Sequence, residues 1–312
     1  MKKLLIVLLC LVLTCSMTLS ACAEASADDY RIAVVLHAMN SSFYTKLADG
    51  ARAAGADLGI TVDVTSPTQA SSLDEQVSLI ENCIAADYDA IATVTWDPTG
   101  FNKVIAKANE AGIPVIGFNM AAEGSGVVAD IGQNHVDAGY TLGKYMFEAM
   151  GGEGKYCICT CSPTDSALLA REEGIANAAA EYPGVELVQV IDITTDLTAA
   201  NAAIENAYLA DPDIKAFIGV DCFSESIGTY IAANGLTGKV LGGGFDLTEG
   251  TLKHIKNGDM QVTIGQNPFM QGYYSVLELY LSLKYGQSVM PIDINTGAKV
   301  IDSSNVDLVE PE

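Results

Sequence analysis

Short apolar runs alternate along the chain with longer segments in which apolar residues recur every three or four positions. Runs of the first kind are typical of strands buried in a parallel sheet, and segments of the second kind are typical of amphipathic helices. Strands are expected at 31–36, 60–64, 90–94 and 113–118, with helices at 43–58, 73–84 and 101–111 between them. Residues 72–75, Ser-Leu-Asp-Glu, match a capping box that would begin the second helix.

The same alternation starts again at residue 156. Strands are expected at 156–159, 185–191, 216–220 and 239–242, and helices at 168–180 and 199–209. Strands separated by helices of this length form βαβ units with parallel strands, and two successive sets indicate two doubly wound lobes. The pattern therefore predicts an α/β fold of two parallel-sheet lobes, with sites beyond the carboxyl ends of the strands.

The amino-terminal segment has a different pattern. Lys2 and Lys3 precede an apolar run at 4–12 and then Leu-Ser-Ala-Cys at 19–22. A basic start, an apolar run too short to span a bilayer and a small-residue cleavage site predict a signal peptide over 1–21. The four residues ending at Cys22 resemble the bacterial lipoprotein box, which implies a lipid on Cys22, a tether over 22–29 and anchoring to the cell membrane. An ordinary secretory signal followed by a chance cysteine is the alternative, and either reading places the protein outside the cytoplasm.

Charge and length narrow the classes of partner. The chain has 39 acidic and 16 basic residues, and its net charge of −23 becomes −25 once Lys2 and Lys3 leave with the signal. Such a surface repels phosphate backbones and anionic lipid, so nucleic acid is not an expected partner. No later segment has about 18 uninterrupted apolar residues, which predicts a water-soluble body on a lipid tether.

Five cysteines lie beyond Cys22: Cys83, Cys157, Cys159, Cys161 and Cys222. An odd number is a poor disulfide framework, and the three at 157–161 alternate along an expected strand, so their thiols would share one buried face. Zinc would need a further ligand, and the three histidines form no ligand-like cluster. We expect core thiols and no metal.

Motifs for nucleotide binding and catalysis fail on inspection. Residues 151–155, Gly-Gly-Glu-Gly-Lys, suggest a phosphate loop, but Ala149 replaces the leading glycine and Tyr156 stands where a Ser or Thr would bind magnesium. Ser224 and Ser226 lack the Gly-x-Ser-x-Gly context of a nucleophile. The sequence therefore predicts that the protein has no cofactor and is not an enzyme.

Five ordered motifs resemble the periplasmic sugar-binding proteins of the ribose and galactose type, the substrate receptors of ABC importers. They are Asn-Ser-Ser-Phe-Tyr at 40–44, Ala-Gly-Ile-Pro-Val-Ile at 111–116 before Asn119, Arg-Glu-Glu-Gly-Ile at 171–175, Gly-Phe-Asp at 244–246 and Ile-Gly-Gln-Asn-Pro at 264–268. The resemblance covers about Tyr30 to Val309. It implies a type I periplasmic binding fold with three crossovers, near 134–135, 266–267 and 294–295. The lobes would comprise 30–134 with 267–294 and 135–266 with 295–312, and would close around ligand.

The resemblance also implies the residues that bind ligand. Phe43 and Tyr44 match the aromatic pair that packs on the sugar ring, although one of them could be helix core. Arg171 matches the arginine that reaches sugar oxygens, Asp246 the carboxylate that accepts from two hydroxyls, and Gln266 an amide that donates and accepts. The other candidates are Ser41, which could instead cap the helix that follows, Trp96, Asn119 and Asp221.

Two departures bear on the ligand. Asn119-Met120 stands where pentose receptors carry an Asp-Arg pair, and Thr195-Asp196 where an aromatic residue usually precedes an aspartate, so ribose itself is not the expected ligand. Trp96, the only tryptophan, could replace the lost aromatic surface or pack on the lobe surface. We expect a monomer that takes up a monosaccharide or related polyol for an ABC permease. Sensing for a membrane signalling protein is the alternative, and an extracellular glycoside hydrolase, which needs a spaced carboxylate pair, is disfavoured.

Overall fold

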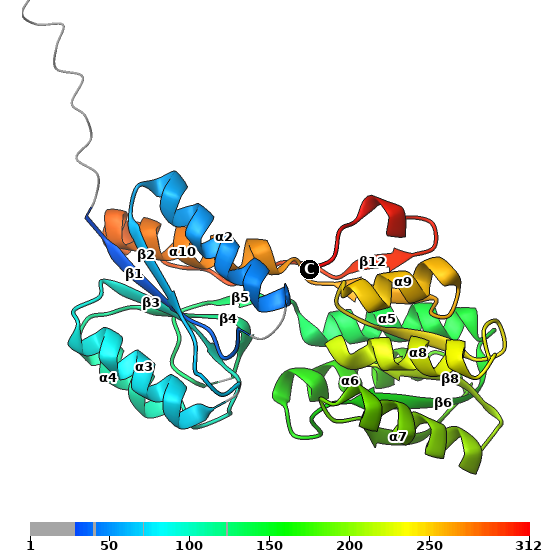
Figure 1. Ribbon diagram of the computed structural model, residues 1–312. Helices are drawn as coiled ribbons and strands as arrows, with labels where there is room; N and C mark the ends of the chain where they lie inside the picture. Colours follow the sequence, from blue (N-terminus) through cyan, green and yellow to red (C-terminus); the bar gives the residue numbers. More distant parts are fainter. Residues whose placement is uncertain (1–28, 40–41, 71, 123) are drawn as a thin grey trace, which may run out of the picture.

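The computed structural model describes residues 29–39, 42–70, 72–122 and 124–312, and within them the chain forms two lobes side by side (Figure 1). The expected signal peptide, Cys22 and Ser41 lie outside the described residues. Each lobe contains one six-stranded sheet. The prediction of two doubly wound parallel-sheet lobes is thereby confirmed.

The sheet of the first lobe has the strand order β11-β5-β4-β3-β1-β2, and all its pairings are parallel. Its strands are β1 (Arg31–Val35), β2 (Thr61–Thr65), β3 (Ala90–Thr95), β4 (Val115–Ala121), β5 (Asp130–Gly132) and β11 (Ile294–Asn295). Its helices are α2 (Ser42–Leu58), α3 (Leu73–Ala85), α4 (Asn102–Glu110) and α10 (Pro268–Tyr285). Because side chains alternate along β1, Ile32 and Val34 pack toward α2 and α10, whereas Ala33 and Val35 pack toward α3 and α4.

The sheet of the second lobe has the order β12-β10-β9-β8-β6-β7. Its strands are β6 (Glu153–Thr160), β7 (Gly184–Asp192), β8 (Ile214–Gly219), β9 (Leu241–Phe245), β10 (Val262–Gly265) and β12 (Lys299–Asp302), the last antiparallel to β10. Its helices are α5 (His135–Ala149), α6 (Ser166–Ala179), α7 (Leu197–Ala210), α8 (Glu225–Ala233) and α9 (Glu249–Asn257). Short 3-10 turns lie at Cys222–Ser224, Gly286–Ser288 and Val306–Leu308.

The described chain passes between the two sheets three times. The passages connect β5 to α5, β10 to α10 and β11 to β12. The third was expected near 294–295, and it directly follows Asn295, since both of these residues pair with β5 in the first sheet. Strands β5, β10 and β11 each end at one of these passages, so the carboxyl ends of the parallel strands, where such folds bind ligands, lie on the side of each lobe next to the passages.

Two local expectations differ from the structure. The capping box at Ser72 does not form, because the Glu75 carboxylate instead accepts hydrogen bonds from the main-chain N–H groups of Thr68 and Gln69. The strand expected at 239–242 begins at Leu241, because the 3-10-like turn before it uses the N–H groups of Lys239 and Val240 to bond the Leu236 carbonyl.

The cysteines behave largely as core residues. Cys157 and Cys159 are fully buried in one apolar cluster, whereas Cys161, beyond the end of β6, is half-buried against another. The shared buried face is therefore confirmed for two of the three thiols. All five cysteines of the described residues are free. Among these residues no helix is long and apolar enough to cross a membrane, and no group of three metal-ligating side chains comes together.

Candidate ligand-binding site between the lobes

Three buried polar residues form a hydrogen-bonded chain between the lobes. Asn119 comes from β4 of the first lobe, Asp246 follows β9 of the second lobe, and Gln266 lies on the passage after β10. Gln266 Nε2 donates to Asp246 Oδ1 at 2.6 Å, and Asn119 Nδ2 donates to Gln266 Oε1 at 3.4 Å. All three are at most 6% exposed. The structure thus brings together three of the residues that the sequence predicts for the site.

The backbone at two of these positions is in the left-handed region. Asn119 has φ of 63° and Asp246 has φ of 65°, although neither is glycine. Non-glycine residues adopt this conformation at a cost, and such strain accumulates where a side chain must be aimed at a particular place. Burial raises the pKa of Asp246, while the Arg171 charge and the Gln266 hydrogen bond act in the opposite direction. The carboxylate is therefore held in a poorly solvated position, where it accepts one side-chain hydrogen bond from the described part of the chain.

The two aromatic residues at the start of α2 both pack against the core of the first lobe. Phe43 is 8% exposed and packs in the core of the first lobe, with its ring edge-to-face on Tyr44 at 5.3 Å. The Tyr44 hydroxyl lies 2.8 Å from Nε2 of His37. Burial raises the pKa of Tyr44 well above its usual value, and the next contributions come from Cys222 and Asp246 of the other lobe. Tyr44 therefore faces the second lobe across the site.

Arg171 is held by the protein itself. Its two terminal nitrogens donate to the Val220 carbonyl at 2.7 Å and to Gln133 Oε1 at 3.1 Å, and the guanidinium lies 3.9 Å from the centre of the Phe245 ring. Nε is buried and has no partner among the described residues. The arginine expected to bind ligand thus lies beside the site, clamped between β8 and the first passage.

Asp221 is placed by its role as a cap. Its carboxylate accepts from the main-chain N–H groups of Phe223 at 2.8 Å and Cys161 at 2.6 Å. Burial raises its pKa to about 6, although these hydrogen bonds oppose the shift. Two main-chain N–H groups of the protein therefore hold the Asp221 carboxylate in place, and a contact of this carboxylate with ligand stays a prediction.

Trp96 follows β3 and belongs mainly to the first lobe. Its Nε1 donates to Gln76 Oε1 at 3.0 Å, and its ring lies edge-to-face on Phe101 at 6.0 Å. Its indole N–H is therefore satisfied within the lobe, and a contact of its ring with ligand stays a prediction. Nothing can be said of Ser41, which lies outside the described residues.

Three polar residues at the site escaped the sequence reasoning. His37 lies just beyond β1, Gln133 donates to the Gly265 and Gly297 carbonyls, and His135 Nε2 lies 3.1 Å from the Asn119 carbonyl oxygen. Burial lowers the pKa of His37 to about 4, and burial with the nearby Arg171 lowers that of His135 to about 3. A polar residue directly after an apolar strand was the available signal, since that is where sites of such folds lie.

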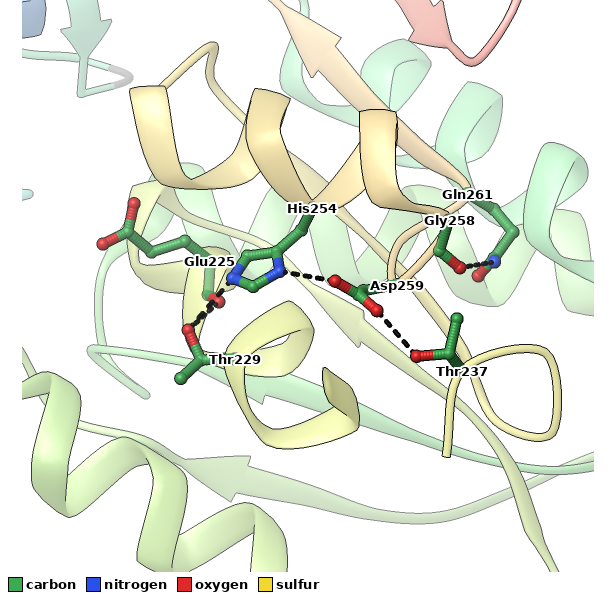
Figure 2. A network of polar contacts seen from close by, with 7 residues as sticks. All are labelled: Glu225, Thr229, Thr237, His254, Gly258, Asp259 and Gln261. Atoms are coloured by element: carbon green, nitrogen blue, oxygen red, sulfur yellow. Dashed lines mark hydrogen bonds and ion pairs between the residues drawn. The ribbon is translucent and has the colours of Figure 1, made fainter. Parts of the chain in front are cut away.

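A second polar network lies within the second lobe, between α8 and α9 (Figure 2). His254 Nδ1 is 3.0 Å from Asp259 Oδ2, Thr237 donates to the other carboxylate oxygen, and Thr229 lies 3.2 Å from His254 Nε2. The Thr229 hydroxyl also bonds the Glu225 carbonyl one turn earlier in the helix. The network joins two packed helices and a turn, and it shares no residue with the site between the lobes.

Comparison with known proteins agrees with this architecture. The chain is 25% identical to a xylose/arabinose-binding protein of Sulfolobus acidocaldarius, covering 89% of this chain and 72% of that protein. It is 25% identical to the D-allose-binding periplasmic protein of Escherichia coli, covering 91% and 93%. An ABC transporter solute-binding protein of Burkholderia graminis, solved with D-arabinose, is 28% identical, with a TM-score of 0.83 and 89% and 97% of the chains covered.

The family profile described as the periplasmic binding protein domain matches residues 32–288. This match spans both lobes and all three residues of the buried polar chain. The chain belongs to the periplasmic binding protein family.

Proposed function

We propose that this protein captures a monosaccharide or related polyol between its lobes, outside the cytoplasm, and delivers it to an ABC importer. The observation that carries the proposal is the buried chain of Asn119, Gln266 and Asp246, with Tyr44 facing it from the first lobe. Amide and carboxylate oxygens accept from hydroxyls, amide nitrogens donate to them, and an aromatic ring packs on an apolar sugar face. The relatives that bind arabinose, xylose and allose support the same ligand class.

Several finer features complete the proposal. The lobes divide near 134–135, 266–267 and 294–295, the working unit is a monomer, and a lipid on Cys22 tethers it to the membrane. Ser41, Phe43, Trp96, Arg171 and Asp221 complete the ligand contacts. Arg171 contributes through Nε, which has no partner among the described residues, while each of its terminal nitrogens already donates one hydrogen bond, to Val220 or to Gln133.

The test is a thermal-shift screen of the mature protein against pentoses, hexoses, inositols and nucleosides, followed by calorimetric titration of each compound that raises Tm. We expect at least one sugar or polyol to bind in the micromolar range or tighter and to be recovered chemically unchanged. Binding confined to nucleosides, absence of any stabilisation, or cleavage of the bound sugar would contradict the proposal.

A further inference from the structure

His37 and Tyr44 form a polar pair on the first lobe. His37 is 7% exposed, its Nε2 lies 2.8 Å from the Tyr44 hydroxyl, and the two rings meet edge-to-face with centroids 4.7 Å apart. The other ring nitrogen, Nδ1, is buried and has no hydrogen-bond partner among the described residues. A buried polar atom without a partner is uncommon in a folded protein, because it has lost its water without replacement.

The position of the pair indicates what Nδ1 is for. His37 lies just beyond the carboxyl end of β1, the edge at which parallel α/β sheets bind ligands. Burial raises the pKa of Tyr44, to which His37 is bonded, and Asp246 of the second lobe is close enough for its carboxylate charge to raise this pKa further. The pair therefore stands on the wall of the site that faces the buried polar chain.

Counting the polar hydrogens of His37 and Tyr44 shows which donors and acceptors of the pair remain free for a ligand. A neutral imidazole has one N–H and tyrosine has one O–H, and their mutual bond uses one of these two hydrogens. If Tyr44 donates to Nε2, the free group is the Nδ1–H donor. If Nε2–H donates to Tyr44, the free groups are the Nδ1 acceptor and the phenol O–H. A ligand hydroxyl can satisfy either arrangement, since it both donates and accepts, whereas a carbon-bound hydrogen at that place satisfies neither.

We propose that His37 is a specificity-determining residue of the site, which fixes the Tyr44 hydroxyl through Nε2 and binds one hydroxyl of the ligand through Nδ1. This inference rests on the proposed function and deepens it, because it assigns one recognised hydroxyl to the first lobe. Burial lowers the pKa of His37 to about 4, so the ring is neutral at the pH at which the protein works. A neutral ring suits an uncharged ligand.

Two substitutions separate the two ring nitrogens. In His37→Gln the side-chain amide reaches the place of Nε2 and keeps a partner for Tyr44, but nothing replaces Nδ1. In His37→Asn the shorter amide replaces Nδ1 and leaves Tyr44 without its partner. We expect His37→Gln to weaken binding of the tightest sugar from the screen about tenfold or more, as befits one lost buried hydrogen bond. His37→Asn retains more of the affinity than His37→Gln if Nδ1 is the ligand-binding atom.

Deoxy sugars supply a readout that a merely structural role would not move. The wild-type protein and His37→Gln are titrated with the sugar and with each of its monodeoxy analogues. We expect one hydroxyl whose removal weakens wild-type binding about tenfold but hardly changes binding to His37→Gln, because the partner of that hydroxyl is already absent. Removal of the other hydroxyls should weaken both proteins equally. His254→Gln, in the network of Figure 2, is the matched control and should retain wild-type discrimination.

The outcomes are distinguishable. A wild-type protein that binds no sugar contradicts the proposed function and this inference with it. The inference alone is contradicted if the wild-type protein binds sugar and His37→Gln keeps both its affinity and the wild-type discrimination at every hydroxyl. If His37→Gln fails to fold, ¹⁵N-imidazole NMR of the wild-type protein decides the question. The His37 Nδ1 resonance should then shift on saturation with the sugar, and an unchanged resonance would overturn the assignment.

Discussion

At the scale of single residues, burial decides what each polar group can do. Asp246 and Asn119 have few protein partners and hold strained backbone conformations, which favours a role toward ligand. Arg171 and Asp221 are each held in place by two hydrogen bonds within the protein. These four side chains, all predicted from the sequence for the site, are therefore not equivalent.

Asp246→Ala should weaken binding of the ligand by about 2 kcal/mol or more, because ligand hydroxyls and Gln266 would be buried without an acceptor. Calorimetric titration of the purified variant measures the effect. Cys157→Ala, in the core of the same lobe, is the control and should bind as the wild type does. An unchanged dissociation constant for Asp246→Ala would remove this carboxylate from the site.

Asp130 gives a prediction on pH. Burial, and then the charge of Asp293, raise its pKa to about 7 in the folded protein. The folded pKa lies above the unfolded value of about 4, so the folded state retains a proton that the unfolded state releases, and stability falls as pH rises from about 4 to about 7. Asp130→Asn should remove this loss. The unfolding free energy of Asp130→Asn minus that of the wild type should therefore increase by about 2 kcal/mol from pH 5 to pH 8, as measured by urea denaturation at each pH.

A parallel loss of stability with rising pH in wild type and Asp130→Asn would contradict this account of the buried carboxyl. Glu173→Ala, at an exposed position on α6, is the matched control, and its curve should follow that of the wild type at every pH.

At the scale of elements, the helices α5 and α6 are positioned by glycines. A Cβ at Gly139 of α5 would lie 2.1 Å from the Arg171 carbonyl oxygen, and one at Gly174 of α6 would lie 2.1 Å from the Val136 carbonyl oxygen. The two helices therefore approach to backbone contact, which only residues without a side chain permit. This approach sets the height at which Arg171 reaches Val220 and Gln133.

Gly139→Ala should force the two helices apart. We expect a loss of about 1–3 kcal/mol in unfolding free energy, together with weaker ligand binding because Arg171 moves with its helix. Denaturation and titration measure the two effects. Asn177→Ala, exposed on α6, should change neither. Full stability in Gly139→Ala would show that the interface relaxes without strain.

At the scale of the whole molecule, the three passages between the sheets allow the lobes to move as bodies. Hydrogen bonds near these passages, such as His135 Nε2 with the Asn119 carbonyl, link the lobes close to the axis of such a motion. Closure around ligand is the usual motion of two lobes joined in this way.

Small-angle scattering should therefore show a smaller radius of gyration at saturating ligand than without ligand. Asp246→Ala at the same ligand concentration should keep the value of the free protein, because it binds too weakly to close. Equal radii for free and saturated wild type would contradict a closing mechanism.

The sequence determined the two sets of βα units, because the alternation of buried strands and amphipathic helices depends on neighbours along the chain. It also determined which strand ends carry Asn119, Asp246 and Gln266. Tertiary structure alone decided that Glu75 bonds Thr68 rather than capping α3, and that Arg171 is held by Val220 and Gln133. It also revealed His37 beside Tyr44. The partners of Arg171 lie 49 and 38 residues away along the chain, so they meet it only in the folded protein. Glu75 and His37 lie only seven residues from their partners, but neither pair belongs to a single helix or strand, so each contact is set by the packing of the lobe and not by a local repeat.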